Sequence, residues 1–250
     1  MHNKEREMEI LNILKAADGF VTTKQLCDML FASESSIRRD LKELEKQHLV
    51  KRSYGGVLPI TNFSNIVTFN QRTKQNAEQK REIAQKAVSL IKDGQIIFLD
   101  QSSTSFYLAN ELVNRNSITI VTNNIEILML LSRSNNKIIS SGGYLSNENR
   151  NCLIGGDAVD SFNNIFADFA FFSIKGIDYD GTVTDCAREE IIVRNAMLKN
   201  AKQKVLLCDS TKFGRKASYI QCHLKDIEHL VSDGDAAQSF SKLKLKIELL

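Results

Sequence analysis

Short apolar runs alternate with helical patterns through most of this 250-residue chain, and this alternation constrains its fold more than any other feature. Strand–helix alternation favours an α/β fold, here a Rossmann-like, mostly parallel sheet covered by helices. The expected strands are 96–99, 118–121, 137–140, 169–172, 205–208 and 229–231, and the expected helices are 78–91, 105–113, 125–131 and 189–200. A last segment, 243–249, alternates with period two and is expected to form an edge strand.

Polar residues follow several of the expected strands at the points where the strands end. In open sheets of this kind, ligands bind beyond the carboxyl ends of the strands. A hydroxyl-rich turn that enters a helix offers N–H groups, hydroxyls and the positive helix end, which together suit a phosphate. A capped helix start explains any single turn better, but four turns at one sheet edge favour a ligand site. The candidate contacts are Asp100, Ser102, Ser103, Thr104, Thr122, Asn123, Gly142, Gly143, Asp209 and Lys212.

The segment 33–47 carries the strongest indication of function. Ser33 can cap a helix whose buried face holds aliphatic residues and whose other face holds hydroxyls and basic side chains. Such a helix can lie in the major groove of DNA, where arginine pairs with phosphate or a guanine edge. Taken alone, the helix is better explained as an ordinary solvated helix. Its candidate DNA contacts are Ser33, Ser35, Ser36, Arg38, Arg39 and Lys42.

The neighbouring segments strengthen the DNA-binding interpretation. A first helix around 10–14 and a second helix beginning at Thr22 or Thr23 precede the 33–47 helix, which predicts a helix-turn-helix over about 20–39. Residues 49–59 are expected to form two short strands around Gly55-Gly56, which permits a positive φ. A basic hairpin after a recognition helix is typical of a wing. The further candidate DNA contacts are Thr23, Arg52, Tyr54 and Gly55.

With these elements in this order, the chain resembles the DeoR family of bacterial transcriptional regulators. The matching segments are Ser-Ser-Ile-Arg-Arg-Asp-Leu at 35–41, Arg52-x-x-Gly55-Gly56, Phe69-x-x-Arg72, Glu78-x-Lys80-x-x-Ile83-Ala84, Thr122-Asn123, Gly142-Gly143 and Asp-Ser-Thr-Lys-Phe at 209–213. The resemblance implies a winged helix-turn-helix domain over 1–60, a linker over 61–78 and an effector-sensing, oligomerising domain over 79–250 that is similar to sugar-phosphate isomerases. It also adds Lys175 and Glu190 to the expected effector contacts.

The resemblance implies a cytoplasmic, sequence-specific regulator that binds double-stranded operator DNA as a homodimer or tetramer. It further implies a repressor of a carbohydrate operon that is controlled by a phosphorylated sugar or a related metabolite. Three residues depart from the family pattern. His48 and Ser102 stand where the family usually has glycine, and Tyr54 stands where it usually has histidine.

Two alternative functions remain open from the sequence. The first is sugar-phosphate isomerisation, which needs a carboxylate base. Isomerases of this type carry an acidic stretch after the strand that corresponds to 169–172, whereas this chain has Ser173-Ile174-Lys175-Gly176. No catalytic residue is therefore predicted. The second alternative keeps the DNA-binding role and makes the C-terminal half an oligomerisation platform without a ligand.

Composition narrows the class of protein. The net charge of +3 argues against a general polyanion binder, and a hydrophobic fraction of 42% supports folded cores. The five cysteines are scattered and the four histidines do not cluster with them, so we expect reduced thiols and no metal. No cofactor is expected. Neither a signal peptide nor an apolar run of membrane-spanning length is evident, which predicts a cytoplasmic protein without a membrane partner.

Overall fold

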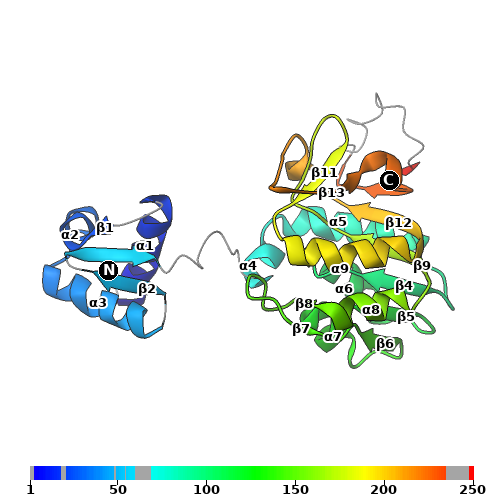
Figure 1. Cartoon of the computed structure of the whole chain (residues 1–250), viewed down its shortest axis with the longest axis horizontal. Helices are drawn as coiled ribbons and strands as arrows, with labels where there is room; N and C mark the ends of the chain where they lie inside the picture. The colour runs from blue at the N-terminus through cyan, green and yellow to red at the C-terminus, as the bar shows by residue number, and fades with distance from the viewer. Residues whose placement is uncertain (1–2, 18–20, 48, 54, 60–68, 235–247) are drawn as a thin grey trace. The chain divides into compact units, whose positions relative to one another are not determined.

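Two compact units make up the chain, Met1–Ile66 and Val67–Leu250, which we call the N-terminal and C-terminal units (Figure 1). The computed structural model describes residues 3–17, 21–47, 49–53, 55–59, 69–234 and 248–250.

The N-terminal unit packs helices α1 (Asn3–Ala17), α2 (Thr23–Leu30) and α3 (Glu34–Lys46) against a small antiparallel sheet. The sheet has the order β1 (Val21–Thr22), β3 (Gly56–Pro59), β2 (Val50–Ser53). Thr22 caps α2 in a capping box with Gln25, and Ser33 caps α3. The predicted helix-turn-helix and the β2–β3 wing hairpin are both confirmed. Their shared core consists of Ile10, Leu14, Val21, Leu26, Ile37, Leu41, Leu44, Val50 and Val57.

A seven-stranded sheet forms the centre of the C-terminal unit. Every neighbouring pair in it is parallel. Its strand order is β15 (Glu248–Leu249), β14 (His229–Val231), β12 (Ala201–Leu207), β9 (Ala167–Phe172), β4 (Ile96–Leu99), β5 (Thr119–Thr122), β6 (Lys137–Ser140). The carboxyl ends of these strands therefore lie at one edge of the sheet, which confirms the predicted α/β fold class.

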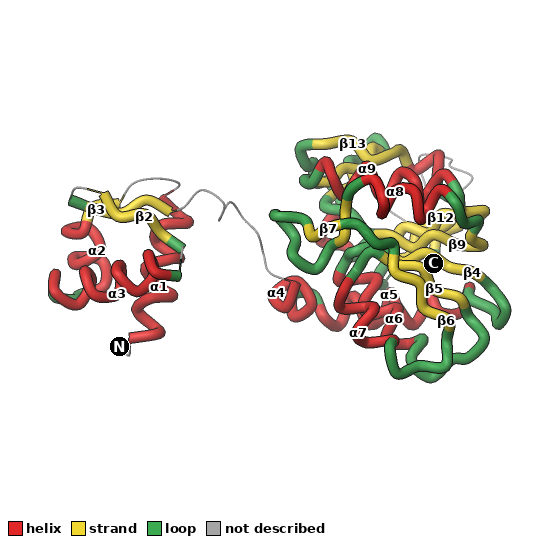
Figure 2. The backbone as a smooth tube through the Cα atoms, turned by 60° about the horizontal axis from the view of Figure 1, so that its bottom comes forward, coloured by secondary structure: helices red, strands yellow, loops and turns green. Residues whose placement is uncertain are grey.

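Helices cover both faces of this sheet, as Figure 2 shows. Helices α5 (Ala77–Ala87), α6 (Ser103–Glu111) and α7 (Ile125–Leu131) pack on the face that carries Ile97 and Phe171. Helices α8 (Gly156–Asn163) and α9 (Arg188–Lys199) pack on the face that carries Phe98 and Phe172. Successive strand residues point to opposite faces, so each fully buried strand needs a continuous apolar run.

Two small antiparallel sheets lie outside the predicted alternation. One has the order β10 (Gly176–Ile177), β11 (Thr182–Asp185), β13 (Tyr219–His223), and the other pairs β7 (Tyr144–Leu145) with β8 (Leu153–Ile154). The short 3₁₀ segments are η2 (Val88–Leu90), η3 (Ser210–Lys212) and η4 (Leu224–Asp226). The strands of the two small sheets were not predicted, because they are short and lack a long apolar or alternating run.

The predicted linker 61–78 requires a correction in its described part. Residues 69–74 form helix α4 (Phe69–Lys74), and α5 begins at Ala77. The ring of Phe69 is buried and packs edge-on against the ring of Phe106 at 5.5 Å between centroids. This tertiary contact stabilises a helix that is too short to form alone, which a reading of composition could not detect.

The edge strand predicted over 243–249 is confirmed in its described part. Glu248–Leu249 forms β15 at the edge of the large sheet, parallel to β14. The remainder of the predicted strand, 243–247, lies outside the described residues. In the ranges that the structure describes, no helix has the length and apolar character that crossing a bilayer requires.

Gly142 and Gly143 connect β6 to β7, and both have positive φ angles, +68° and +94°. Their surroundings differ. A Cβ atom on Gly143 would lie 2.2 Å from the backbone oxygen of Ile154, whereas a Cβ on Gly142 would meet nothing within 4 Å. Gly143 is therefore required by backbone packing as well as by its φ angle.

We expect Gly143→Ala to destabilise the C-terminal unit much more than Gly142→Ala. The matched variant Gly142→Ala should cost about 1 kcal/mol, the ordinary penalty for left-handed backbone. Gly143→Ala should cost roughly 3 kcal/mol or more, because the β7–β8 hairpin must also shift. Urea unfolding followed by circular dichroism measures both, and equal costs would contradict the packing argument.

Candidate functional site

Helix α3 presents a polar, basic face to solvent. Ser35, Arg38, Arg39 and Lys42 are exposed and Ser36 is half-buried, while Ile37, Leu41 and Leu44 lie in the core. The Ser36 N–H donates to the side-chain oxygen Oγ of Ser33 at 3.4 Å, and this bond holds the first turn of α3. The amphipathic division expected for a groove-binding helix is thus present.

Two arginines at this surface already have carboxylate partners. Arg38 donates to Glu34 one turn away at 2.6 Å, and Arg52 donates to Glu45 at 2.7 Å. Exposed pairs of this kind contribute little stability, so a phosphate can replace the carboxylate at small cost. Within the described residues, Arg39 and Lys42 form no ion pair, and they are available for DNA without any exchange.

An ion pair to a buried carboxylate fixes the orientation of α3, and no local sequence pattern indicates it. Asp40 is fully buried and accepts hydrogen bonds from Nε and Nη2 of Arg6 on α1. The carboxylate of Asp40 holds the pKa of Arg6 above its ordinary value. Asp40 lies between Arg39 and the buried Leu41, so the pair sets the rotation at which α3 exposes Arg39.

The wing connects to the helix-turn-helix through the backbone. The Thr23 N–H at the start of α2 donates to the Gly55 oxygen at 3.0 Å, and Gly55 has a φ of +79°. Thr23 is half-buried at this junction, and Arg52 is exposed on β2. Tyr54 and His48 lie outside the described residues.

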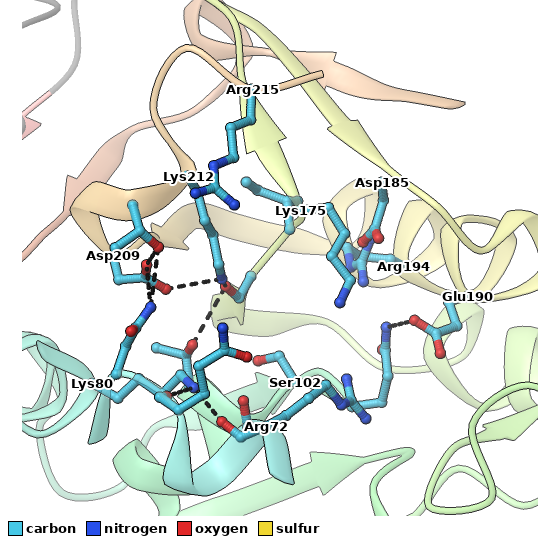
Figure 3. A pocket seen from close by; sticks show the side chains of 18 residues that line it. Arg72, Lys80, Ser102, Lys175, Asp185, Glu190, Arg194, Asp209, Lys212 and Arg215 are labelled. Atoms are coloured by element: carbon cyan, nitrogen blue, oxygen red, sulfur yellow. Dashed lines mark hydrogen bonds and ion pairs between the residues drawn. The ribbon is translucent and has the colours of Figure 1, made fainter. Parts of the chain in front are cut away.

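A cavity of about 160 Å³ lies at the carboxyl edge of the large sheet, and we call it the strand-end pocket (Figure 3). Side chains from α4, α5, α6, α9 and the segments after β4, β9 and β12 surround it. Its lining residues are Arg72, Gln75, Asn76, Lys80, Gln101, Ser102, Ser103, Thr104, Ser173, Ile174, Lys175, Asp185, Glu190, Arg194, Asp209, Thr211, Lys212 and Arg215.

The hydroxyl-rich turn after β4 leads directly into α6 at one side of the pocket. Ser102 caps α6, because its oxygen accepts from the Ser105 N–H at 3.0 Å. The first N–H groups of a helix have no intrahelical acceptor and point toward its N-terminal end. The Ser102 side chain therefore serves the helix cap, and the backbone after it provides donors for an anion.

Lys212 and Lys80 add positive charge beside this turn. The ammonium of Lys212 donates to the Ser173 hydroxyl at 2.8 Å and lies 3.4 Å from a carboxylate oxygen of Asp209. Lys80 is almost fully buried and donates to the backbone oxygens of Arg72 and Gln75. Burial, reinforced by the charge of Lys212, lowers the pKa of Lys80 to about 8.

A buried polar network forms the opposite wall of the pocket. Arg194 donates to Asp185 at 2.9 Å, to Gln221 at 2.8 Å and to Asp100 at 3.3 Å. Burial alone would lower the pKa of Arg194, but the carboxylates of Asp185, Asp100 and Glu190 outweigh it and raise the pKa. Glu190 accepts from Gln101 and Asn149, and burial raises its pKa.

The strand-end pocket can bind an anion that also carries hydroxyl groups. Ammonium and guanidinium groups, hydroxyls and helix N–H groups suit phosphate, while carboxylates and amides suit sugar hydroxyls. In the described part of the chain, no group of three or more His, Cys, Asp or Glu side chains is placed to hold a metal ion.

Comparison with known proteins identifies the family. The DeoR-like helix-turn-helix domain matches residues 6–63, and the DeoR C-terminal sensor domain matches residues 75–234. This chain belongs to the DeoR family of transcriptional regulators. It is 33% identical to the transcriptional repressor GlcR of Bacillus subtilis over 97% of this chain and 93% of the relative. It is 32% identical to the glycerol-3-phosphate regulon repressor of Escherichia coli over 87% of this chain and 85% of that protein.

Solved structures similar to this DeoR-family chain are more distant. Ribose 5-phosphate isomerase from Methanocaldococcus jannaschii shares 20% identity at a TM-score of 0.43, over 56% of this chain and 55% of that one. A likeness at this level does not bear on activity. The relatives named above are transcriptional regulators, in agreement with the prediction that this chain is not an enzyme.

The strand-end pocket brings together seven of the expected effector contacts: Ser102, Ser103, Thr104, Lys175, Glu190, Asp209 and Lys212. Asp100 lies behind the pocket wall, where it is fully buried. Thr122, Asn123, Gly142 and Gly143 do not line the pocket. Asn123 instead donates to the Leu153 oxygen at 3.1 Å, so the β7–β8 hairpin occupies the end of β5.

The strand-end pocket is also lined by residues that were not predicted from the sequence: Arg72, Gln75, Asn76, Lys80, Gln101, Ser173, Ile174, Asp185, Arg194, Thr211 and Arg215. Arg72 and Lys80 lie in segments that match the family pattern, and this match could have indicated them as site residues. Arg194 lies four residues after Glu190 on the buried face of α9, where a charged residue indicates a partner.

Proposed function

We propose that this DeoR-family regulator binds operator DNA through α3 and its wing, and binds a phosphorylated sugar or related metabolite in the strand-end pocket. The observation that carries the sensor role is the basic, hydroxyl-rich lining of that pocket at the start of α6. The exposed basic face of α3 supports the DNA-binding surface. We further propose a cytoplasmic homo-oligomer, in which two helices reach adjacent half-sites.

The regulator is proposed to repress an operon of carbohydrate metabolism. Two of its relatives are named as repressors, GlcR and the glycerol-3-phosphate regulon repressor, while a third is named as an L-fucose operon activator. Effector binding changes operator affinity only if it favours one arrangement of the DNA-binding units, with a typical coupling of ~1–3 kcal/mol. A C-terminal unit that oligomerises without a ligand is the second candidate, and calorimetry against a panel of sugar phosphates separates the two.

Arg39→Ala should weaken operator binding by ~1–3 kcal/mol if Arg39 contacts a base edge. Gel shifts with the DNA upstream of its own gene and of neighbouring genes measure this. Arg115→Ala, which removes the same charge from the C-terminal unit, is the matched control and should leave affinity unchanged. Unchanged affinity in Arg39→Ala would remove this residue from the interface, and no shift with the unaltered protein would overturn the proposed function.

Lys212→Ala should leave operator binding intact and reduce the response to effector. The variant loses the ammonium that lies beside Ser173 and Asp209 in the pocket. Lys216→Ala is the control, because Lys216 pairs with Asp178 and does not line the pocket. An equal loss of DNA binding and effector response in Lys212→Ala would instead assign Lys212 a structural role.

Effector affinity should fall as the pH rises above about 8. A bound phosphate beside Lys80 favours the ammonium form and raises its pKa above the free value of about 8, so binding takes up a proton. The favourable contribution is complete below pH 8 and is lost as the pH passes the higher pKa of the complex. Each unit of that increase is worth about tenfold in affinity.

Calorimetry at pH 7.5 and 9 in buffers of different ionisation heat measures this proton uptake. Lys80→Met should bind more weakly, with an affinity that no longer varies over this pH range. Circular dichroism checks that the variant is folded. Proton uptake that is the same in Lys80→Met would assign the titration to another group.

A further inference from the structure

Carboxylates are unevenly placed among the cations of the strand-end pocket. Six of its lining residues are arginine or lysine and three are aspartate or glutamate. The buried Asp100 behind the pocket wall is a fourth carboxylate, and it pairs with Arg194. Not every cation has such a partner, so the positions of the cations without one indicate where an anion can bind.

Two of the cations are placed side by side on neighbouring segments. Lys175 precedes β10, and Arg215 follows Gly214, whose N–H donates to the Ile177 oxygen at 2.8 Å. A Cβ on Gly176 would lie 2.3 Å from the Arg215 backbone oxygen, so the two backbones touch. This packing fixes the segments that carry Lys175 and Arg215 next to each other.

Neither of these two cations has a carboxylate partner at ion-pair distance among the residues that the structure describes. By contrast, Arg194 in the same pocket has two carboxylate partners, Asp100 and Asp185, and Lys212 has one, Asp209. Both Lys175 and Arg215 are exposed. Adjacent like charges without a counter-ion disfavour each other, and an anion bound between them removes that cost.

The cation pair lies away from the turn that suits the first phosphate. Figure 3 shows Lys175 and Arg215 across the pocket from Ser102, Arg72 and Lys80. The Lys212 ammonium lies between the two groups and donates to Ser173. The pocket therefore has two separate regions that suit anionic groups. The carboxylates of Asp209 and Glu190 and the amide of Gln101 line the same pocket.

We propose that the effector carries two anionic groups: a phosphate at the start of α6 and a second phosphate or a carboxylate that Lys175 and Arg215 bind. This inference rests on the proposed sensor function and narrows its ligand class to sugar bisphosphates and phosphorylated sugar acids. A neutral sugar end would leave the cation pair without a partner, since hydroxyl groups supply no charge.

Calorimetry with the full-length protein tests this proposal through matched ligands. One pair is fructose 6-phosphate and fructose 1,6-bisphosphate, and another is glucose 6-phosphate and 6-phosphogluconate; pentose and triose counterparts extend the panel. At least one doubly anionic ligand should bind about tenfold or more tightly than its monophosphate counterpart. The bisphosphate and acid arms distinguish a second phosphate from a carboxylate.

Four variants separate a specific second site from general electrostatic attraction. Lys175→Ala and Arg215→Ala should each reduce the preference for the doubly anionic ligand while leaving monophosphate affinity within about twofold. Lys216→Ala, which removes the adjacent charge outside the pocket, should keep the preference. Lys175→Arg should restore most of the affinity that Lys175→Ala loses.

The outcomes distinguish this inference from the function on which it rests. Equal affinity for both members of every matched pair, with monophosphates bound, would overturn the second anionic site and leave the sensor proposal standing. The same holds for a preference that survives in both alanine variants. Binding of no member of the panel would overturn the sensor role itself.

Discussion

The buried carboxylate of Asp100 holds the walls of the strand-end pocket together. It accepts hydrogen bonds from the Ser102 N–H at 3.1 Å, the Ser105 hydroxyl at 2.7 Å and the Ser173 N–H at 3.1 Å, and it faces Arg194 at 3.3 Å. These partners come from the turn after β4, the first turn of α6, the residue after β9 and helix α9. A single charge thus fixes three of the pocket walls relative to one another.

This arrangement explains why a charged group is retained in a fully buried position. An isolated carboxylate there would be strongly unfavourable, but Arg194 and the three donors satisfy its oxygens. The guanidinium of Arg194 is in turn shared with Asp185 and Gln221. Loss of Asp100 would leave Arg194 with one carboxylate fewer and would release the turn that begins α6, so the pocket depends on it without its contacting the ligand.

Much of the fold follows from the sequence because parallel strands and amphipathic helices have simple patterns. The run at 96–99 is buried on both faces and has no other reasonable structure, and the helix at 125–131 begins and ends as predicted. Short segments that depend on distant contacts could not be predicted. Helix α4 is held by the contact of Phe69 with Phe106, and no local pattern shows this.

Site residues that directly follow a strand of the large sheet could be predicted from the sequence. The turn at 102–104 and the pair Asp209 and Lys212 lie in the pocket because they follow β4 and β12 directly. Thr122 and Asn123 also lie at the end of a strand, but the β7–β8 hairpin forms hydrogen bonds with Asn123 and covers that strand end. Arg194 and Lys80 reach the pocket from helices, where only tertiary packing decides which charged side chain points inward.

Arg72 and Gln75 bring the first described part of the C-terminal unit to the strand-end pocket. Both line the pocket, and α4, which carries Arg72, is the first described element after β3 of the N-terminal unit. The Lys80 ammonium donates to the Arg72 and Gln75 carbonyls, and burial lowers the pKa of Lys80 to about 8. Under the proposed sensor function, an anion beside Lys80 would act on the group that holds these two carbonyls. It would alter operator binding only through a difference in its affinity for two states of the protein.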